Sequence, residues 1–152
     1  MLPTPKKMKL VAAGAEGPTA LNAFDNALLQ AGIGNINLIR VSSILPPGCV
    51  HEPGFSVPPG SLTPTAYGYL ISDQPGTEIA AAIGVGFSED DYGVIMEFEG
   101  ICDRASAADR VAEMVRQAFV SRDRRLHDLR VEAASHRVER QGAVIAAAVM
   151  WY

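Results

Sequence analysis

Apolar and polar side chains alternate along several stretches of the chain, and a period of two is typical of β-strands. In the stretch Gly93–Gly100, Glu97 and Glu99 share a face with Ile95, while the opposite face is entirely apolar. The segment Glu78–Ile83 is rich in alanine, so a helix stays open there as an alternative. In all, strands are predicted over Lys7–Gly14, Gly34–Ser42, Thr65–Ser72, Glu78–Phe87, Gly93–Gly100, Leu126–Arg137 and Ala143–Trp151.

A helical period occurs twice. The first stretch follows the turn at Gly17–Pro18 and predicts about four helical turns that end at Gly32. Its apolar stripe consists of Leu21, Phe24, Leu28 and Ala31. Asp25 flanks this stripe, a position typical of a solvated charge. The second helix is predicted to be capped by Ser106, and its stripe consists of Ala108, Val111, Ala112, Val115, Ala118 and Phe119.

The predicted elements are mostly strands, with one helix early and one late in the chain. This order predicts an α+β fold in which helices pack on an antiparallel or mixed sheet. With 152 residues, 48% of them hydrophobic, the chain can build one full core, so a single domain over residues 1–152 is expected. The segment Pro46–Pro64 is long for a loop and rich in proline and glycine, which is typical of functional or pinned loops.

Charge and hydropathy exclude two broad classes of function. The formal net charge of -4 disfavours a general nucleic-acid binder, because phosphate neutralisation requires a basic surface. No apolar run reaches the length of a membrane span, and Met1–Lys9 lacks the apolar centre of a signal peptide. The sequence therefore predicts a cytoplasmic protein with neither a nucleic-acid nor a membrane partner.

Cysteine and lysine positions narrow the choice of cofactor. Cys49 and Cys102 lie far apart, so a single disulfide stays open but no structural zinc site is predicted. All lysines occur within the first nine residues of the chain. Pyridoxal phosphate requires a lysine inside its site, so that cofactor is disfavoured.

No standard catalytic signature is present, neither a GxSxG elbow, nor a phosphate-binding loop with its lysine, nor an HExxH helix. The notable feature is the serine pair Ser42-Ser43, which follows an apolar strand and precedes Pro46-Pro47. Serine pairs are common, and the ordinary interpretation is a strand end with two hydrogen-bonded hydroxyls. By the same reasoning Asn37 can be a buried amide, and Glu97 part of a solvated strand face.

Five separated blocks of the sequence share a family resemblance. The stretch Thr19–Pro47 resembles the first half of the pyruvoyl-dependent arginine decarboxylases. The resemblance continues through Pro64–Tyr69 with Ile71–Asp73, through Met96–Gly100, and to the terminal Ala146–Ala148 and Trp151-Tyr152. It covers nearly the whole chain in order. The fold it implies is a layered α+β sandwich of mainly antiparallel sheet flanked by helices.

The resemblance also implies a reaction. Self-cleavage between Ser42 and Ser43 would give a small N-terminal and a larger C-terminal chain, with Ser43 converted to a pyruvoyl group. This covalent cofactor would act as the electron sink in the decarboxylation of L-arginine to agmatine and carbon dioxide. The absence of an interior lysine agrees with a cofactor that replaces pyridoxal phosphate. The family implies a homotrimer of cleaved protomers with sites between subunits.

Four residues receive roles from this resemblance. Ser43 would be both the nucleophile and the cofactor precursor, and Asn37 would assist cleavage by donating to the oxyanion at the Ser42 carbonyl. Glu97 would donate a proton to the α-carbon after decarboxylation; the like charge of Glu99 favours a protonated acid there. Asp25 would bind the guanidinium of the substrate through two parallel hydrogen bonds. No metal ligands are predicted.

Two other interpretations stay open. The first keeps the pyruvoyl chemistry but changes the amino acid substrate, because the segment Gly48–His51 departs from the family pattern. The second is a non-catalytic oligomeric homologue that keeps the fold and remains uncleaved.

Overall fold

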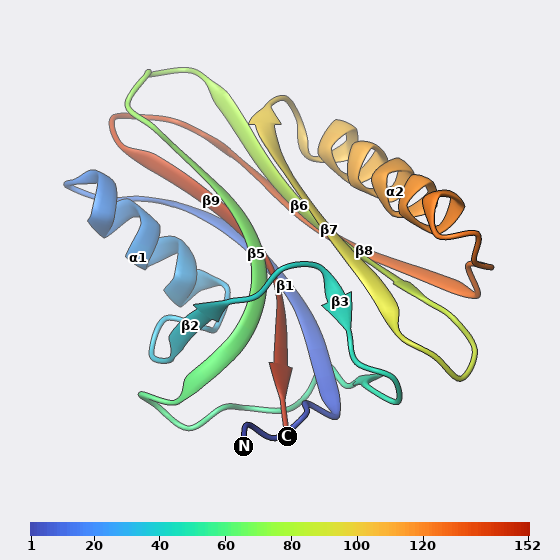
Figure 1. The fold of residues 1–152 in the computed structure, drawn as a ribbon. Helices are drawn as coiled ribbons and strands as arrows, with labels where there is room; N and C mark the ends of the chain where they lie inside the picture. Colours follow the sequence, from blue (N-terminus) through green and yellow to red (C-terminus); the bar gives the residue numbers. More distant parts are fainter.

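A computed structural model describes the protein over residues 1–152. Its elements follow one another in the order β1 (Lys7–Glu16), α1 (Ala20–Gln30), β2 (Asn37–Arg40), β3 (Ile44–Leu45), β4 (Val50–His51), β5 (Leu62–Ser72), β6 (Glu78–Phe87), β7 (Gly93–Ile101), α2 (Arg104–Ser121), β8 (Asp128–Arg137) and β9 (Gly142–Trp151). The two chain ends lie together at one end of the molecule (Figure 1), where the Lys6 N–H donates to the Trp151 carbonyl at 2.9 Å.

The strands form two sheets. Sheet A has the order β2-β5-β9-β1-β4, and sheet B has the order β3-β7-β6-β8. The central pairs β1–β9, β5–β9, β6–β7 and β6–β8 are antiparallel, whereas the short edge strands β2 and β4 pair in parallel with β5 and β1. The predicted α+β fold with mainly antiparallel sheets is therefore confirmed.

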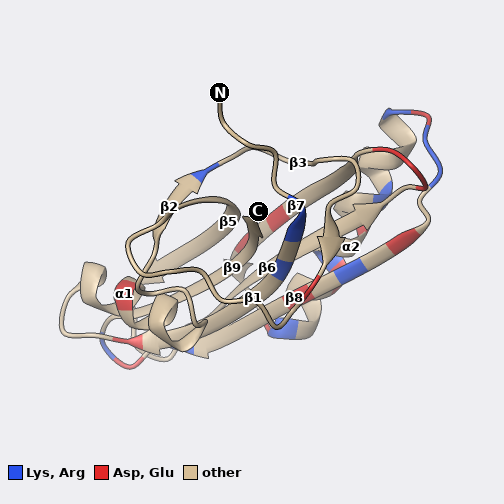
Figure 2. Ribbon diagram, turned by 90° about the horizontal axis from the view of Figure 1, so that it is seen from below, with Lys and Arg blue, Asp and Glu red and all other residues tan.

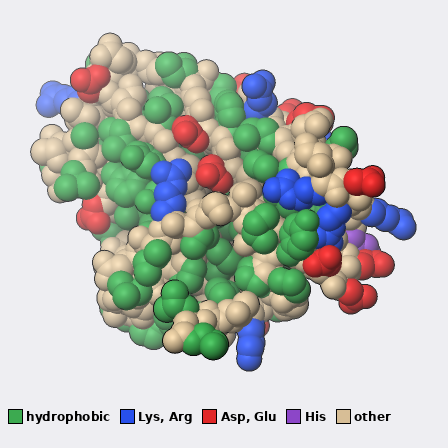
Figure 3. Space-filling model, viewed as in Figure 1, with side chains coloured by type: hydrophobic (Ala, Val, Ile, Leu, Met, Phe, Trp, Pro, Cys, Tyr) green, Lys and Arg blue, Asp and Glu red, His purple; other side chains and the backbone are tan.

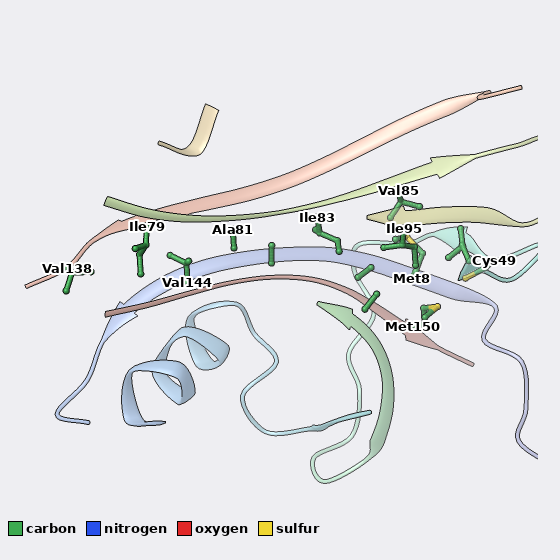
Figure 4. Close-up of a cluster of buried hydrophobic side chains, with 14 residues drawn as sticks. Met8, Cys49, Ile79, Ala81, Ile83, Val85, Ile95, Val138, Val144 and Met150 are labelled. Atoms are coloured by element: carbon green, nitrogen blue, oxygen red, sulfur yellow. The ribbon is translucent and has the colours of Figure 1, made fainter. Parts of the chain in front are cut away.

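The sheets face each other and a helix covers the outer face of each, which gives four layers (Figure 1). The helix α1 packs on β1 and β9 of sheet A, and α2 packs on β6, β7 and β8 of sheet B. Between the sheets, buried side chains from both inner faces meet in one apolar cluster (Figure 4). Many of these side chains are small, such as Ala81, Ala146 and Ala148, so the sheets can approach closely.

Both helices are where the apolar spacing predicts them, but two details of that prediction are wrong. In α1 the fully buried residues are Ala23 and Ala27, and Leu21 is 75% exposed. In α2 the cap is Asp103, not Ser106. The Asp103 carboxylate accepts the Ser106 N–H at 2.7 Å, so the helix begins earlier and Ser106 lies in its first turn.

The strand boundaries also differ from the prediction in two places. Strand β2 is shorter than the predicted Gly34–Ser42, because the chain leaves sheet A after Val41 and joins sheet B at Ile44. Strand β5 begins at Leu62, so the proline-rich loop is shorter than predicted and contains β4. The alternative helix at the start of β6 is wrong. Both faces of β6 are covered, by α2 and by sheet A, and such a strand loses its polar alternation.

Basic and acidic positions are dispersed along the ribbon over several strands and both helices (Figure 2). The only buried polar residues are Thr63 and Thr65. Neither helix of the protein combines the length and the apolar character needed to cross a membrane.

Candidate active site

The serine pair lies where the chain crosses from one sheet to the other. Before the pair, the Val41 N–H donates to the Thr65 carbonyl of β5 in sheet A at 3.1 Å. After the crossing, the Ser43 carbonyl accepts the Ile95 N–H of β7 in sheet B at 2.7 Å. Between these two attachments only Ser42 remains, and it is exposed. The Ser42–Ser43 peptide bond is therefore held from both sides at the open edge of the sandwich.

Glu97 lies on β7 two residues beyond Ile95, the partner of Ser43, and on the same face of the strand. Its side chain is 28% exposed. Burial raises the pKa of Glu97; the charge of Arg40 opposes this rise, and that of Glu99 adds to it. Glu99 itself is exposed. The structure thus distinguishes two carboxylates that periodicity leaves equivalent, and it brings Glu97 toward Ser43.

Arg40, at the end of β2, is the cation nearest to this carboxylate. Its Nη2 donates to the Tyr67 carbonyl of β5 at 2.8 Å, and its guanidinium lies 4.7 Å from the centre of the Tyr67 ring. The same Nη2 is 4.0 Å from Glu97 Oε1. On the face presented in Figure 1, Figure 3 shows basic and acidic side chains next to each other between apolar areas. Arg40 therefore joins β2, β5 and β7 at the opening of the sandwich.

Gly68 of β5 allows the two sheets to approach at this point. A Cβ atom on Gly68 would lie 2.9 Å from Glu99 Oε2 and 3.0 Å from Glu97 Cβ. Carbon atoms normally approach no closer than about 3.5 Å. A larger residue at this position would push the glutamates of β7 away from β5.

The structure does not bring Asn37 and Asp25 to the serine pair within one protomer. The Asn37 amide donates to the Gly60 carbonyl at 2.9 Å. It is separated from Ser42 by five residue steps of mostly extended chain, about 16 Å at the rise of a β-strand. The expected contact of this amide with the Ser42 carbonyl is therefore absent from the protomer. Asp25 lies on the exposed side of α1 and forms no ion pair.

Comparison with known proteins gives a match to one family. The model of the pyruvoyl-dependent arginine decarboxylases matches residues 7–152. The chain belongs to this family. It is 49% identical to the pyruvoyl-dependent arginine decarboxylase of Methanocaldococcus jannaschii over 150 residues, 97% of this chain and 91% of that protein. It is 45% identical to the enzyme of that name from Pyrococcus horikoshii over 152 residues, covering 98% and 96% of the two chains. The corresponding protein of Thermococcus sibiricus is 46% identical over 151 residues, 97% and 96% of the two chains.

Membership of the pyruvoyl-dependent arginine decarboxylases confirms the resemblance found in the sequence, and the family name carries the expected pyruvoyl cofactor. The residues at the sheet crossing fit such a group. A serine that could form it, Ser43, lies at the crossing, and Glu97 is a half-buried acid on the adjacent strand β7. The lysine side chains of β1 lie toward β4, at the other edge of sheet A: Lys7 is 3.8 Å from Glu52, and Lys9 donates to the Phe55 carbonyl.

The sequence interpretation missed Arg40 and Gly68. A signal for each is present in the sequence. Arg40 is a charged residue within the otherwise apolar run Leu38–Val41, two positions before the serine pair. Gly68 interrupts a strand between two tyrosines, and an interior glycine in a strand often marks a close approach of another chain segment.

The segment Gly48–His51, in which the sequence analysis found no family pattern, lies at the opposite edge of sheet A from β2. Cys49 is buried between the sheets, which raises the pKa of its thiol to about 11. Cys49 and Cys102 are both free, so the disulfide left open by the sequence is not formed. An open cavity of about 560 Å³ at this edge is lined by Cys49, Val50, His51, Phe87, Ser88, His127, Asp128 and Arg130. The principal cavities of the protomer are not lined by the serine pair or by Glu97.

Proposed function

We propose that this protein decarboxylates L-arginine to agmatine and carbon dioxide, using a pyruvoyl group that it makes from Ser43. The observation that carries the proposal is the Ser42–Ser43 bond, which is held between the two sheets beside Glu97 in a chain of this family. The relatives named above, from 45% to 49% identical, bear the name of this activity.

Cleavage begins with attack of Ser43 Oγ on the carbonyl carbon of Ser42. The peptide C–N bond breaks, an ester forms in its place, and the amino group of residue 43 is freed. Loss of the proton on Cα of residue 43 then expels the Ser42 carboxylate from Cβ. The dehydroalanine that remains takes up water and loses ammonia to give the pyruvoyl group. The hydrogen bonds of Val41 and Ser43 to opposite sheets support this reaction, because they hold the reacting atoms in position while the peptide bond is replaced by the ester.

When present, the pyruvoyl group supplies the electron sink for loss of carbon dioxide from the amino acid. Glu97 returns a proton to the α-carbon. Its half-buried position favours this role, because burial raises the pKa of the carboxyl group and keeps more of it protonated near neutral pH. Lysines are absent from this edge of sheet A, so no lysine amine competes with the substrate amine for the pyruvoyl group.

Asn37 and Asp25 enter the site from a neighbouring copy in a homotrimer of cleaved protomers. The exposed face of α1 supports this arrangement. Leu21 and Leu29 lie one helical turn on either side of Asp25 and are 75% and 47% exposed. Ile39 of β2 is also exposed. An apolar face of this kind is stabilised by a covering partner, and the Asp25 carboxylate within it can then bind the substrate guanidinium through two hydrogen bonds.

The first experiment is the intact mass of the denatured protein, with and without borohydride in the presence of arginine. The expected result is two chains, residues 1–42 and 43–152, with the larger chain lighter than its serine form by one ammonia. In the presence of arginine, borohydride is expected to fix the amine on the larger chain, which then gains the mass of the amine minus water plus two hydrogen atoms. Ser43→Ala should remain one chain, while Ser56→Ala, at an exposed serine of the proline-rich loop, should be cleaved normally. A wild-type chain that stays intact would support the non-catalytic interpretation.

Glu97→Gln tests the proton donor. The cleaved variant is expected to lose roughly 10²- to 10⁴-fold in kcat, the usual contribution of a positioned acid. Glu99→Gln is the matched control, because it changes the neighbouring exposed carboxylate and should retain most of the activity. Equal losses in the two variants would argue against a specific role for Glu97.

The substrate and the trimer are tested together. Arginine should react much faster than lysine or ornithine, and Asp25→Asn should raise KM for arginine, whereas Asp109→Asn on the exposed face of α2 should not. Sedimentation of the cleaved protein is expected to give three protomers. Faster turnover of another amino acid would favour the alternative substrate.

A further inference from the structure

We propose that Arg40 is a positioning residue of this site, which ties the end of fragment 1–42 to β5 and stabilises the Glu97 carboxylate left after proton transfer. The proposal rests on the proposed function, in which Glu97 donates a proton in each turnover. Because Arg40 lies within residues 1–42, the proposal also gives the small fragment a part in catalysis after cleavage.

The backbone explains why a side chain is needed at this position. Strand β2 pairs with β5 as far as the register Arg40↔Thr65, and the Val41 N–H takes the Thr65 carbonyl. Two residues further along β5, the Tyr67 carbonyl points to the same side as the Thr65 carbonyl. No backbone N–H donates to it from that side, because the chain after Val41 has crossed to sheet B. The Arg40 guanidinium donates to this carbonyl instead, at 2.8 Å.

The contact requires arginine specifically. One planar guanidinium donates to the Tyr67 carbonyl and lies over the Tyr67 ring, with 4.7 Å between its carbon and the ring centre. The ammonium of a lysine is a point charge and cannot form both contacts in the same fixed orientation. With its plane fixed on β5, Arg40 presents Nη2 at 4.0 Å from Glu97 Oε1.

Burial and the charge of Glu99 raise the pKa of Glu97, whereas the charge of Arg40 lowers it. Glu99 from the same strand is the other charged group acting on it, and Tyr67 and Gly68 face it from β5. Burial and Glu99 both favour the protonated carboxyl, so Arg40 is the one group that favours the carboxylate. A proton donor must pass through the carboxylate in every cycle. Without Arg40 the pKa of Glu97 should rise, and transfer of its proton should slow.

Half of the Arg40 side chain is exposed, so an ion pair at 4.0 Å contributes little to folding stability. If Arg40 acted only through folding stability, its replacement should therefore leave the turnover of the folded protein unchanged. The matched control is Arg137 of β8, which also donates to a backbone carbonyl, that of Gly76, at 2.7 Å. Its guanidinium lies 3.5 Å from the carboxylate of Glu78, at the start of β6.

The test compares Arg40→Met, Arg40→Lys and Arg137→Met with the wild-type protein. Cleavage is followed by intact mass and turnover by kcat and KM across pH. The Glu97 carboxyl is titrated by ¹³C NMR and assigned with Glu97→Gln. In Arg40→Met, the pKa of Glu97 and the high-pH limb of kcat should both move to higher pH. The kcat should fall at least tenfold with a smaller change in KM. Arg40→Lys should restore part of the pKa and less of the kcat, and Arg137→Met should match the wild type.

An unchanged Glu97 titration in Arg40→Met would overturn the proposal, even in a protein that still decarboxylates arginine. Conversely, if Glu97→Gln turns over at the wild-type rate, the proposed proton donor is wrong, while the titration still decides whether Arg40 acts on Glu97. The titration does not require cleavage. If Arg40→Met stays uncleaved or folds poorly, Arg40→Lys is titrated in its place, and a wild-type pKa with wild-type kcat in that variant overturns the requirement for a guanidinium.

Discussion

Gly68→Ala offers a direct test of the close approach between β5 and β7. The added Cβ would lie 2.9 Å from Glu99 Oε2, 3.0 Å from Glu97 Cβ and 3.2 Å from Glu97 Cγ. The exposed Glu99 carboxylate can swing away. The Cβ of Glu97 is fixed by its backbone and falls about 0.5 Å short of an ordinary carbon–carbon contact. The strands must therefore separate, and overpacking of this kind typically costs about 1–3 kcal/mol.

The assay compares Gly68→Ala with Gly54→Ala at equal protomer concentration. A Cβ on Gly54 meets nothing within 4 Å, so that substitution should be neutral or slightly stabilising. For a chain of this length, 1 kcal/mol corresponds to about 2–4 °C, so Gly68→Ala should lower the melting midpoint by about 2–12 °C. Displacement of Glu97 should also lower kcat roughly ten- to a hundredfold. A Gly68→Ala protein that melts and turns over like Gly54→Ala would refute the reasoning.

Three further predictions concern stability and reactivity. Ile79→Ala removes a side chain that is fully buried between the sheets and should cost about 2–5 kcal/mol in urea unfolding; a loss below 1 kcal/mol would contradict this packing. Desolvation tends to raise the pKa of Glu16, but the Arg140 N–H at 2.8 Å and His136 at 2.6 Å outweigh it and hold the pKa below its ordinary value. A lowered pKa contributes stability above the unfolded value of about 4.3 and loses it as pH falls through the folded value. Glu16→Gln should therefore be less stable than the wild type near neutrality, and the difference should shrink in acid; a constant difference would exclude this linkage. Finally, Cys49 should react with a thiol reagent only on unfolding, because it is buried and its pKa is about 11. Rapid labelling of native Cys49, assigned by peptide mass, would exclude that burial.

The amount of fold that could be predicted from the sequence depended on how many faces of each element are buried. In β7 the polar residues Glu97 and Glu99 reveal the strand period, because one end of that strand is open. In β6 nearly every residue is buried, so composition remains the only signal and a helix was a reasonable alternative. The buried face of α1 was misjudged because the small residue Ala23 packs on sheet A, whereas the larger Leu21 is exposed.

The family resemblance named four candidate site residues, Ser43, Glu97, Asn37 and Asp25, but it did not predict their arrangement, and it missed Arg40 and Gly68. The distance from Asn37 to Ser42 depends on where the chain leaves sheet A, and this is decided by the pairing of β2 with the distant strand β5. The contacts of Arg40 depend on the same pairing, whereas the close approach at Gly68 depends on the packing of β5 against β7 of the other sheet. Both bring together residues far apart in sequence, which local periodicity does not record.

Cleavage between residues 42 and 43 would also change how the protein can refold. Strand β1 belongs to fragment 1–42, yet it lies inside sheet A between β9 and β4 and pairs with β9 along its whole length. In the uncut chain, covalent connection keeps β1 near its partners at an effective concentration on the order of millimolar for a short flexible link. The cut removes that advantage. The precursor can fold in a unimolecular reaction, whereas the mature protein, once denatured, must reassemble from two pieces, and its recovery will decline on dilution.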